Sequence, residues 1–203
     1  MKNLQRTFVH GKIISKFFID QESIDDLNEK YEDHKNKLDS FGKRLAGRID
    51  DEKNITSIFE NTKAFIPIIN CMGEYVEELK KFGLLEEGTY NLDILSCWVN
   101  DMKSGEYNPP HTHHDNVGFS TVLFLKVPEF INDVTEPHKF KDGQLRFIGV
   151  DGVNGTWVEP KVGDFYIFQA DHQHSVMPFK TKTPNEIRRS MSFNFLANPH
   201  EKK

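Results

Sequence analysis

The sequence predicts an α+β protein in which helices cover one face of a β-barrel or β-sandwich. Up to about residue 90, apolar residues recur at steps of three and four, which is the spacing of one helix face. After that point, seven short runs rich in β-branched and aromatic residues are separated by Gly, Pro and Asn. A helical front followed by many short strands favours helices packed on one face of a β-rich core.

Two amphipathic helices are expected in the front part. The first covers residues 21–38 and the second covers roughly residues 57–82. Pro67 should kink or delay the second helix, and Gly83 is suited to cap its C-terminal end. Both helices carry an apolar stripe of the kind that packs against a core. The stripes consist of Ile24, Leu27, Tyr31 and Leu38 in the first helix, and of Phe65, Ile68, Ile69, Met72, Tyr75, Val76, Leu79 and Phe82 in the second.

The chain of 203 residues suits a single domain over residues 1–203, with a mainly helical front at 1–90 and a β-rich core at 91–197. Turn residues bound each expected strand of the core. These strands cover residues 93–100, 119–127, 144–150, 155–160, 164–170, 174–179 and 187–196.

Composition excludes several classes of function. The net charge of −5 and the pI of about 6.0 lack the basic footprint of a nucleic-acid-binding protein, although a small anionic ligand needs only one local cation. The N-terminal residues do not have the pattern of a signal peptide, and no stretch has the roughly 18 apolar residues of a membrane span. Cys71 and Cys97 form no CxxC pair, so we expect buried, reduced thiols in a cytoplasmic protein. No feature of the sequence specifies an oligomeric state.

Residues 111–115 read HTHHD and place three histidines and an aspartate directly after a double proline. Residues i and i+2 of a strand project to the same side, so His111 can point with His113, and His113 with Asp115. Two imidazoles, or an imidazole with a carboxylate, form half of a transition-metal site. His114 would point to the opposite side. A closed structural zinc site is disfavoured, because no cysteine joins the group.

A further ligand is expected from the segment FQADHQHSVMPF at residues 168–179. Its two histidines, His172 and His174, share a face of the expected strand. A turn at 161–164 leads into the preceding apolar strand, and a short return brings the histidine pair back beside it. The 61 positions between His113 and His174 leave room for the intervening strands, so His174 can reach the first cluster.

The expected strand IRRSMSFNFL, residues 187–196, alternates between an apolar and a polar face. The apolar face should pack against the helices, with Arg189 escaping at the strand end. A polar face on a central strand is costly unless it lines a site or contacts water, and a solvent-facing sheet is the ordinary explanation. Arg188 with Ser190 would offer a guanidinium fork and a hydroxyl group to a carboxylate. The polar face consists of Arg188, Ser190, Ser192 and Asn194.

The histidine-rich motif, the distal histidine and the Arg-x-Ser motif 14 residues after it resemble the iron(II)- and 2-oxoglutarate-dependent oxygenases. The resemblance is closest to a prolyl-hydroxylase-like branch found in phages and marine bacteria. It covers residues 90–196 well and implies a double-stranded β-helix (jelly-roll) core with N-terminal helices packed on one sheet. The segments that carry it are WVNDMKSGEYNPPHTHHDNVGFSTVLFLKVP, EPKVGDFYIFQADHQHSV, IRRSMSFNF and, in the front part, LAGRIDD.

The resemblance implies iron ligands in the first motif and at His174, and it leaves two ligand sets open. The general superfamily pattern His-x-Asp is matched by His113 and Asp115. The branch pattern His-x-His is matched by His111 and His113. Chemistry favours Asp115, because two histidines and one carboxylate form the usual triad of non-haem iron oxygenases. The branch pattern favours His111.

The same resemblance implies Fe(II), 2-oxoglutarate and O2 as cofactor and cosubstrates. Arg188 and Ser190 would hold the distal carboxylate of 2-oxoglutarate. The implied reaction is oxidative decarboxylation to succinate and CO2, coupled to hydroxylation of an unidentified small molecule or peptide. Asn100, Tyr107 and Asn194 are candidates for positions near the site.

The long stretch at residues 128–143 lies between two expected strands. Loops of this length in compact domains are often functional. Our hypothesis is that it forms part of a lid over the substrate, with His138 and Phe140 as candidate contacts. An ordinary surface loop is the alternative.

Two other functions fit parts of the sequence. A cupin-type enzyme with three histidine ligands and no 2-oxoglutarate would also contain the HTH motif, the PKVGD turn and a later histidine. Arg188 and Ser190 argue against it, because such an enzyme does not need them. A non-catalytic jelly-roll binding module would show no metal-dependent response to 2-oxoglutarate.

Overall fold

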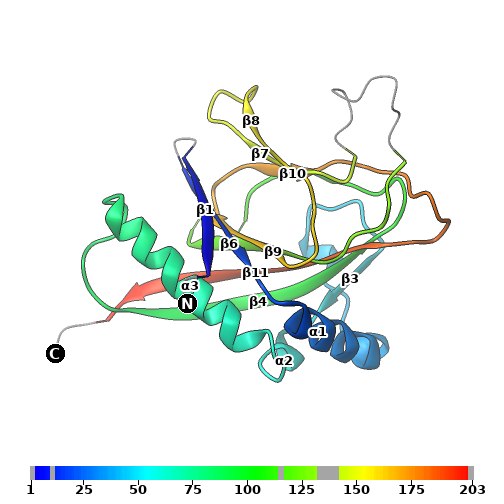
Figure 1. The fold of residues 1–203 in the computed structure, drawn as a ribbon, viewed down its shortest axis with the longest axis horizontal. Coiled ribbons are helices and arrows are strands. Elements are labelled where there is room, and N and C mark those ends of the chain that lie inside the picture. The colour runs from blue at the N-terminus through cyan, green and yellow to red at the C-terminus, as the bar shows by residue number, and fades with distance from the viewer. Residues whose placement is uncertain (1–2, 10–11, 114–116, 132–141, 201–203) are drawn as a thin grey trace.

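Two β-sheets face each other, and helices cover the outer face of the larger sheet (Figure 1). The computed structural model describes residues 3–9, 12–113, 117–131 and 142–200. Within these residues, the larger sheet has 7 strands in the order β1-β2-β9-β6-β11-β4-β3, and the smaller has 4 in the order β5-β10-β7-β8. The paired strands are antiparallel. The expected jelly-roll core with helices on one sheet is confirmed.

The larger sheet consists of β1 (Leu4–Val9), β2 (Ile13–Phe18), β3 (Asp51–Asn54), β4 (Tyr90–Met102), β6 (Phe119–Lys126), β9 (Asp164–Gln169) and β11 (Arg188–Pro199). The smaller sheet consists of β5 (Asn108–His111), β7 (Leu145–Ile148), β8 (Gly155–Val158) and β10 (His174–Val176). All seven strands expected after residue 90 are present, with small shifts at their ends.

The two expected helices are present, and the second is divided. The first is α1 (Gln21–His34), which continues into the short 3-10 helix η1 (Lys35–Lys37). The second consists of α2 (Thr56–Phe59) and α3 (Phe65–Lys81). Pro67 lies in the first turn of α3, where a missing N–H is tolerated, and Gly83 ends the helix with a φ of 68°. No helix within the described ranges is long and apolar enough to cross a membrane.

The front part also contributes strands, which the helical reading of residues 1–90 did not predict. β1 and β2 form a hairpin at one edge of the larger sheet, where β2 pairs with β9. β3 forms the opposite edge and pairs with β4. Phe17 of β2 is fully buried in the core beneath the helices, so this hairpin is integral to the fold.

The central strand β11 separates two apolar cores. Met191, Phe193 and Phe195 lie in the core between the larger sheet and the helices. The opposite face of the strand carries Ser190 and Ser192, which are buried between the two sheets. The expected alternation is thus confirmed, and it directs a polar surface into the interior.

Candidate functional site

The two predicted metal-binding segments meet in the smaller sheet. His111 ends β5, His174 begins β10, and the two residues are paired directly across these strands. β5 is an edge strand, which is where a double proline interrupts the fewest ladder hydrogen bonds. His113 follows β5 and is held by a 2.9 Å hydrogen bond from its backbone N–H to the carbonyl oxygen of Ala170.

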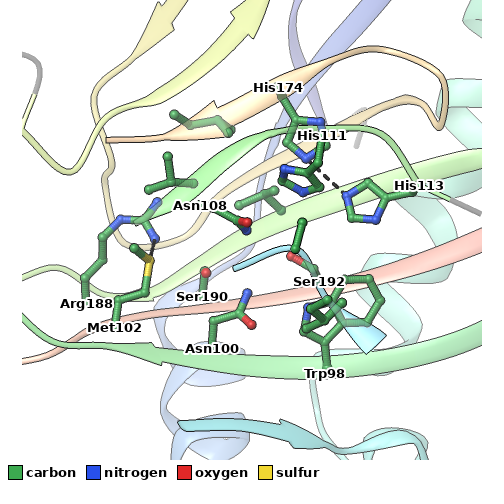
Figure 2. Close-up of a pocket in the computed structure, with 15 residues that line it drawn as sticks. Trp98, Asn100, Met102, Asn108, His111, His113, His174, Arg188, Ser190 and Ser192 are labelled. Atoms are coloured by element: carbon green, nitrogen blue, oxygen red, sulfur yellow. Dashed lines mark hydrogen bonds between the residues drawn. The ribbon is translucent and has the colours of Figure 1, made fainter. Parts of the chain in front are cut away.

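The three imidazole rings form a compact cluster (Figure 2). One ligand nitrogen from each of His111, His113 and His174 lies within 4.8 Å of the others. The Nε2 atoms of His113 and His174 are 3.1 Å apart. Nitrogen atoms bound to one ion at roughly 2.1 Å lie within about 4 Å of each other, so a small adjustment would let all three hold a single metal ion.

Backbone carbonyl groups fix the proton positions on two of these rings. His111 Nδ1–H donates to the carbonyl oxygen of Pro109 at 2.7 Å, and His174 Nδ1–H donates to that of His172 at 2.9 Å. Because a carbonyl oxygen can only accept, each Nδ1 carries the proton. The lone pair therefore lies on Nε2, and in His174 this atom faces Nε2 of His113.

Burial keeps the cluster neutral. Desolvation lowers the pKa of His111 and holds that of His174 well below its usual range. Desolvation also lowers the pKa of His113 to about 3, and the charge of His111 adds to this effect. Neutral imidazole is the form that binds a metal, so the rings need lose no proton at neutral pH.

The other ligand-type residues of the two predicted segments are His114, Asp115 and His172. Asp115 and His114 lie outside the described residues. His172 is buried but does not join the cluster, since its Nε2 lies 3.2 Å from the carbonyl oxygen of Ile148 and its ring packs on Phe147.

A cavity extends between the sheets from the histidine cluster to Arg188 (Figure 2). Asn100, Ser190 and Ser192 project into it from the neighbouring strands β4 and β11. Arg188, Ser190 and Ser192 of the polar face predicted for β11 thus line an internal cavity.

Arg188 is fully buried at the end of the cavity away from the histidines. Its Nη1 donates to Met102 Sδ at 3.3 Å, and its guanidinium carbon lies 4.9 Å from the centre of the Phe124 ring. Its Nε and Nη2 have no hydrogen-bond partner among the described residues. Desolvation lowers its pKa to about 9, so the group is still charged at neutral pH. A buried cation without a partner is costly, which indicates that an anionic ligand binds here.

The expected neighbours of the site are partly present. Ser190 lines the cavity, and Asn100 lies directly across from it on β4, with an Oδ1 that has no partner in the described part of the chain. Asn194 is buried on the same face of β11 but does not line the cavity. Tyr107 does not line it either, and its side chain is exposed at the surface.

The prediction that Arg189 escapes at the strand end is wrong. The residue is fully buried on the helix side of the sheet. Its Nε and Nη2 donate to the two carboxylate oxygens of Asp101 at 2.5 and 2.7 Å, and Nη2 also donates to Glu32 at 2.7 Å. The guanidinium packs 4.4 Å from the centre of the Tyr31 ring. A carboxylate on β4 and a helix cover this charge, and neither is visible in the local sequence.

Several cavity residues were not singled out for a role in the site. Leu45 and Ala46 belong to the LAGRIDD segment, which carried a resemblance without a role. Trp98 precedes Asn100 by two residues, so the alternation of β4 could have indicated it. Asn108 also lines the cavity, and its buried Oδ1 has no partner among the described residues.

The loop hypothesis falls mostly outside the described residues. His138 and Phe140 are both in the range 132–141, of which nothing is described. The loop begins against the core, where the Phe130 ring packs on that of Phe179 at 5.1 Å.

Fold and site together define a class of protein. A jelly-roll core with a histidine cluster at one end of an internal cavity and a buried arginine at the other is the arrangement that the resemblance to the Fe(II)- and 2-oxoglutarate-dependent oxygenases implied. Residues 96–194, just under half of the chain, match the family model described as "Putative 2OG-Fe(II) oxygenase". This match supports the superfamily that the resemblance indicated. A comparison with curated proteins gave no match.

Solved structures of prolyl hydroxylases share the fold. A prolyl-4-hydroxylase from Pseudomonas putida matches with a TM-score of 0.61 and 21% identity over 95% of each chain. A Trichoplax adhaerens prolyl hydroxylase, in complex with a hypoxia inducible factor peptide fragment, matches with a TM-score of 0.57 and 14% identity over 93% of this chain and 84% of that one. The viral collagen prolyl hydroxylase of Paramecium Bursaria Chlorella virus-1, in complex with 2OG, matches with a TM-score of 0.51 and 14% identity over 90% of this chain and 94% of that one. At these identities the likeness establishes the fold alone.

Proposed function

We propose that this protein is an Fe(II)- and 2-oxoglutarate-dependent dioxygenase that hydroxylates a small molecule or peptide and releases succinate and CO2. One observation carries the proposal: a single cavity joins three neutral histidines to a buried guanidinium that has no anionic partner among the described residues. The family-model match over residues 96–194 and the fold shared with prolyl hydroxylases support the same class.

His111, His113 and His174 would hold the metal. Imidazole nitrogen suits Fe(II), and the two carbonyl-bound Nδ1 groups keep Nε2 available for it. Three protein ligands leave coordination positions for other molecules, as catalysis at a metal requires. We propose this set because its three members are gathered in one cluster. Asp115 lies outside the described residues, and the two sets are separable by mutation.

Arg188 and Ser190 would hold the distal carboxylate of 2-oxoglutarate. The guanidinium has two nitrogens that lack partners in the described chain, and a carboxylate can accept from both at once. The Ser190 hydroxyl lines the same cavity and can donate a further hydrogen bond. Met102 and Phe124 exclude water from around the guanidinium, which strengthens its attraction for an anion.

When bound, iron, 2-oxoglutarate and dioxygen supply the oxidation chemistry, and the chain orients and shields them. The distance between the histidine cluster and Arg188 sets which 2-oxo acids can reach both. Asn100 offers the cavity an acceptor, and Trp98 forms an apolar wall beside His113, with ring centres 5.8 Å apart. These side chains restrict both the orientation of the ligand and the entry of water.

The test is an anaerobic titration of Fe(II) and then 2-oxoglutarate, followed by visible absorption. The wild-type protein should give the metal-to-ligand charge-transfer band of a chelated 2-oxo acid, and Arg188→Ala should need far more 2-oxoglutarate to give it. Arg146→Ala is the matched control, since Arg146 stacks on Trp157 away from the cavity. Bound iron without a band in the wild type would refute the proposal.

The three-histidine cluster also favours a second candidate, a cupin-type metalloenzyme that does not use 2-oxoglutarate. Such an enzyme would leave the buried charge of Arg188 without a function. Metal binding that is insensitive to 2-oxoglutarate in both the wild type and Arg188→Ala would favour this candidate.

A further inference from the structure

One wall of the cavity is formed by a short segment from the front part of the chain. We call residues 42–47 the strap; they comprise the 3-10 helix η2 (Gly42–Arg44) and the three residues after it. Leu45 and Ala46 of the strap line the cavity together with Trp98. The residue before the strap, Phe41, stacks on Trp98 with ring centres 5.4 Å apart and planes at 23°. Movement of the strap would therefore change both the cavity wall and the surroundings of Trp98.

The strap rests on the side chain of Glu52 in β3. Oε2 of Glu52 lies 2.9 Å from the position that a Cβ would occupy on Gly42, and Oε1 lies 3.1 Å from that position on Gly47. Glu52 is only 2% exposed. The start of the strap is also held to the backbone of Glu52, because the Phe41 N–H donates to the Glu52 carbonyl oxygen at 2.8 Å. The carboxyl group is thus enclosed between the two ends of the strap.

No group in the described chain compensates a charge on this carboxyl. Neither oxygen of Glu52 has a hydrogen-bond partner among the described residues. Burial raises the pKa of Glu52 to about 7, and the nearby negative charge of Glu106 adds to this shift. Lys43, Arg44 and Arg48 on and beside the strap are exposed. The directly paired residue on β4 is Asn100, which is uncharged.

We propose that Glu52 is a positioning residue whose neutral carboxyl group seats the strap against the cavity and whose ionisation releases it. A neutral carboxyl group can donate a hydrogen bond, and its neighbour Asn100 has a buried Oδ1 that lacks a partner in the described chain. An ionised one can only accept, and it is costly to keep buried without a cation. Release of the strap would move Leu45 and Ala46 and expose Trp98.

The direction of the pH dependence follows from the raised pKa of Glu52. While the strap is seated, the Glu52 carboxyl group keeps its proton up to about pH 7, whereas an exposed glutamate loses its proton near pH 4.5. The ratio of seated to released strap should therefore fall by up to about tenfold per pH unit between these values and level off above them. This role concerns the strap itself, so it is tested without iron, 2-oxoglutarate or activity.

The experiment uses Trp98 as a fluorescent reporter. The chain has 2 tryptophans, so the Trp157→Phe protein keeps Trp98 alone. Acrylamide quenching of its fluorescence is measured from pH 5 to 8. We expect quenching to rise severalfold toward pH 7 and then level off. Adding Glu52→Gln, which stays neutral, should keep quenching low at every pH. The same pH profile with and without Glu52→Gln, or a flat profile in both, would overturn the proposal.

Limited trypsin digestion gives a second readout at the strap. Lys43, Arg44 and Arg48 are cleavage sites in or beside it, and exposed Lys63 in another segment serves as the internal standard. At pH 8 the parent protein should be cut at the strap several times faster than Glu52→Gln, relative to Lys63. Equal relative rates would count against the proposal. A failure of 2-oxoglutarate binding would leave both readouts unaffected, so it would be attributed to the proposed function instead.

Discussion

Two adjacent arginines of β11 have opposite surroundings. Both side chains are fully buried. Arg189 donates to two carboxylates, whereas Arg188 contacts a thioether and an aromatic ring. Since an uncompensated buried charge destabilises the fold, Arg188 is better explained by a ligand than by stability.

Arg188→Met should therefore separate ligand binding from folding. Removing the charge should leave the unfolding free energy of the ligand-free protein unchanged or higher. The affinity for 2-oxoglutarate should fall by roughly 10- to 100-fold, as expected from losing charge-assisted hydrogen bonds of about 1.5–3 kcal/mol. Thermal unfolding with Mn(II), with and without 2-oxoglutarate, measures both effects. Strong destabilisation of the ligand-free protein would instead give the guanidinium a structural role.

The choice of the third metal ligand is also decided by single residues. If His111 completes the site with His113 and His174, His111→Ala should weaken Fe(II) binding by at least about 10-fold, and Asp115→Ala should change it little. Anaerobic equilibrium dialysis of both variants measures this. The reverse ranking would replace the three-histidine set with two histidines and a carboxylate.

At the scale of elements, Arg189 and Asp101 connect β11, β4 and α1. Asp101 lies on the helix side of β4, and Glu32 reaches the same guanidinium from α1. The first residues of β11, including Arg188, are thereby fixed to the neighbouring strand and to the helix layer. The cavity arginine is held in place from the opposite face of the sheet.

Asp101→Ala should destabilise the protein by about 3–5 kcal/mol, because it leaves the buried Arg189 charge without its closest partner. Glu22→Gln is the control: it breaks the exposed pair with Lys63 and should cost less than about 1 kcal/mol. Urea unfolding followed by circular dichroism measures both. Similar losses for the two variants would show that the buried pair has no special weight.

At the scale of the whole molecule, the N-terminal hairpin completes the core. Phe17 of β2 is fully buried and packs on Phe165 of β9, with ring centres 6.2 Å apart. Its neighbour Phe18 points away and is 45% exposed. The helices therefore cover a sheet that includes residues from the start of the chain.

Phe17→Ala should lower the unfolding free energy by about 3–5 kcal/mol, the usual cost of removing a buried phenylalanine. Phe18→Ala is the matched control and should change it by less than about 0.5 kcal/mol. Chemical denaturation of both variants tests the difference. If Phe17→Ala were as mild as Phe18→Ala, the hairpin would not be part of the cooperative core.

Patterns with a strong period were predictable from the sequence. The alternation of β11 and the stripes of α1 and α3 follow from local spacing. The approach of His174 to His113 was expected from the turn at 161–164 and the short return after it. The strand β3 was missed because it is short and polar, whereas β1 and β2 lie in a front part that was interpreted as mainly helical. Their strand conformation depends on pairing with β9 and β4.

Features set by contacts across the fold could not be predicted. The burial of Arg189 depends on Asp101, 88 positions away in the chain. The enclosure of Glu52 depends on the path of the strap. Sequence spacing also could not rank His111 against Asp115, since both share a face with His113.

The paired arginines also restrict how β11 can be aligned. A shift of one residue turns every side chain of a strand to the other face of the sheet. Arg188 would then enter the apolar layer beneath the helices, while Arg189 would leave Asp101 and Glu32. Two guanidinium groups would lose suitable surroundings at once. Misaligned intermediates of this strand should therefore be too unstable to persist during folding.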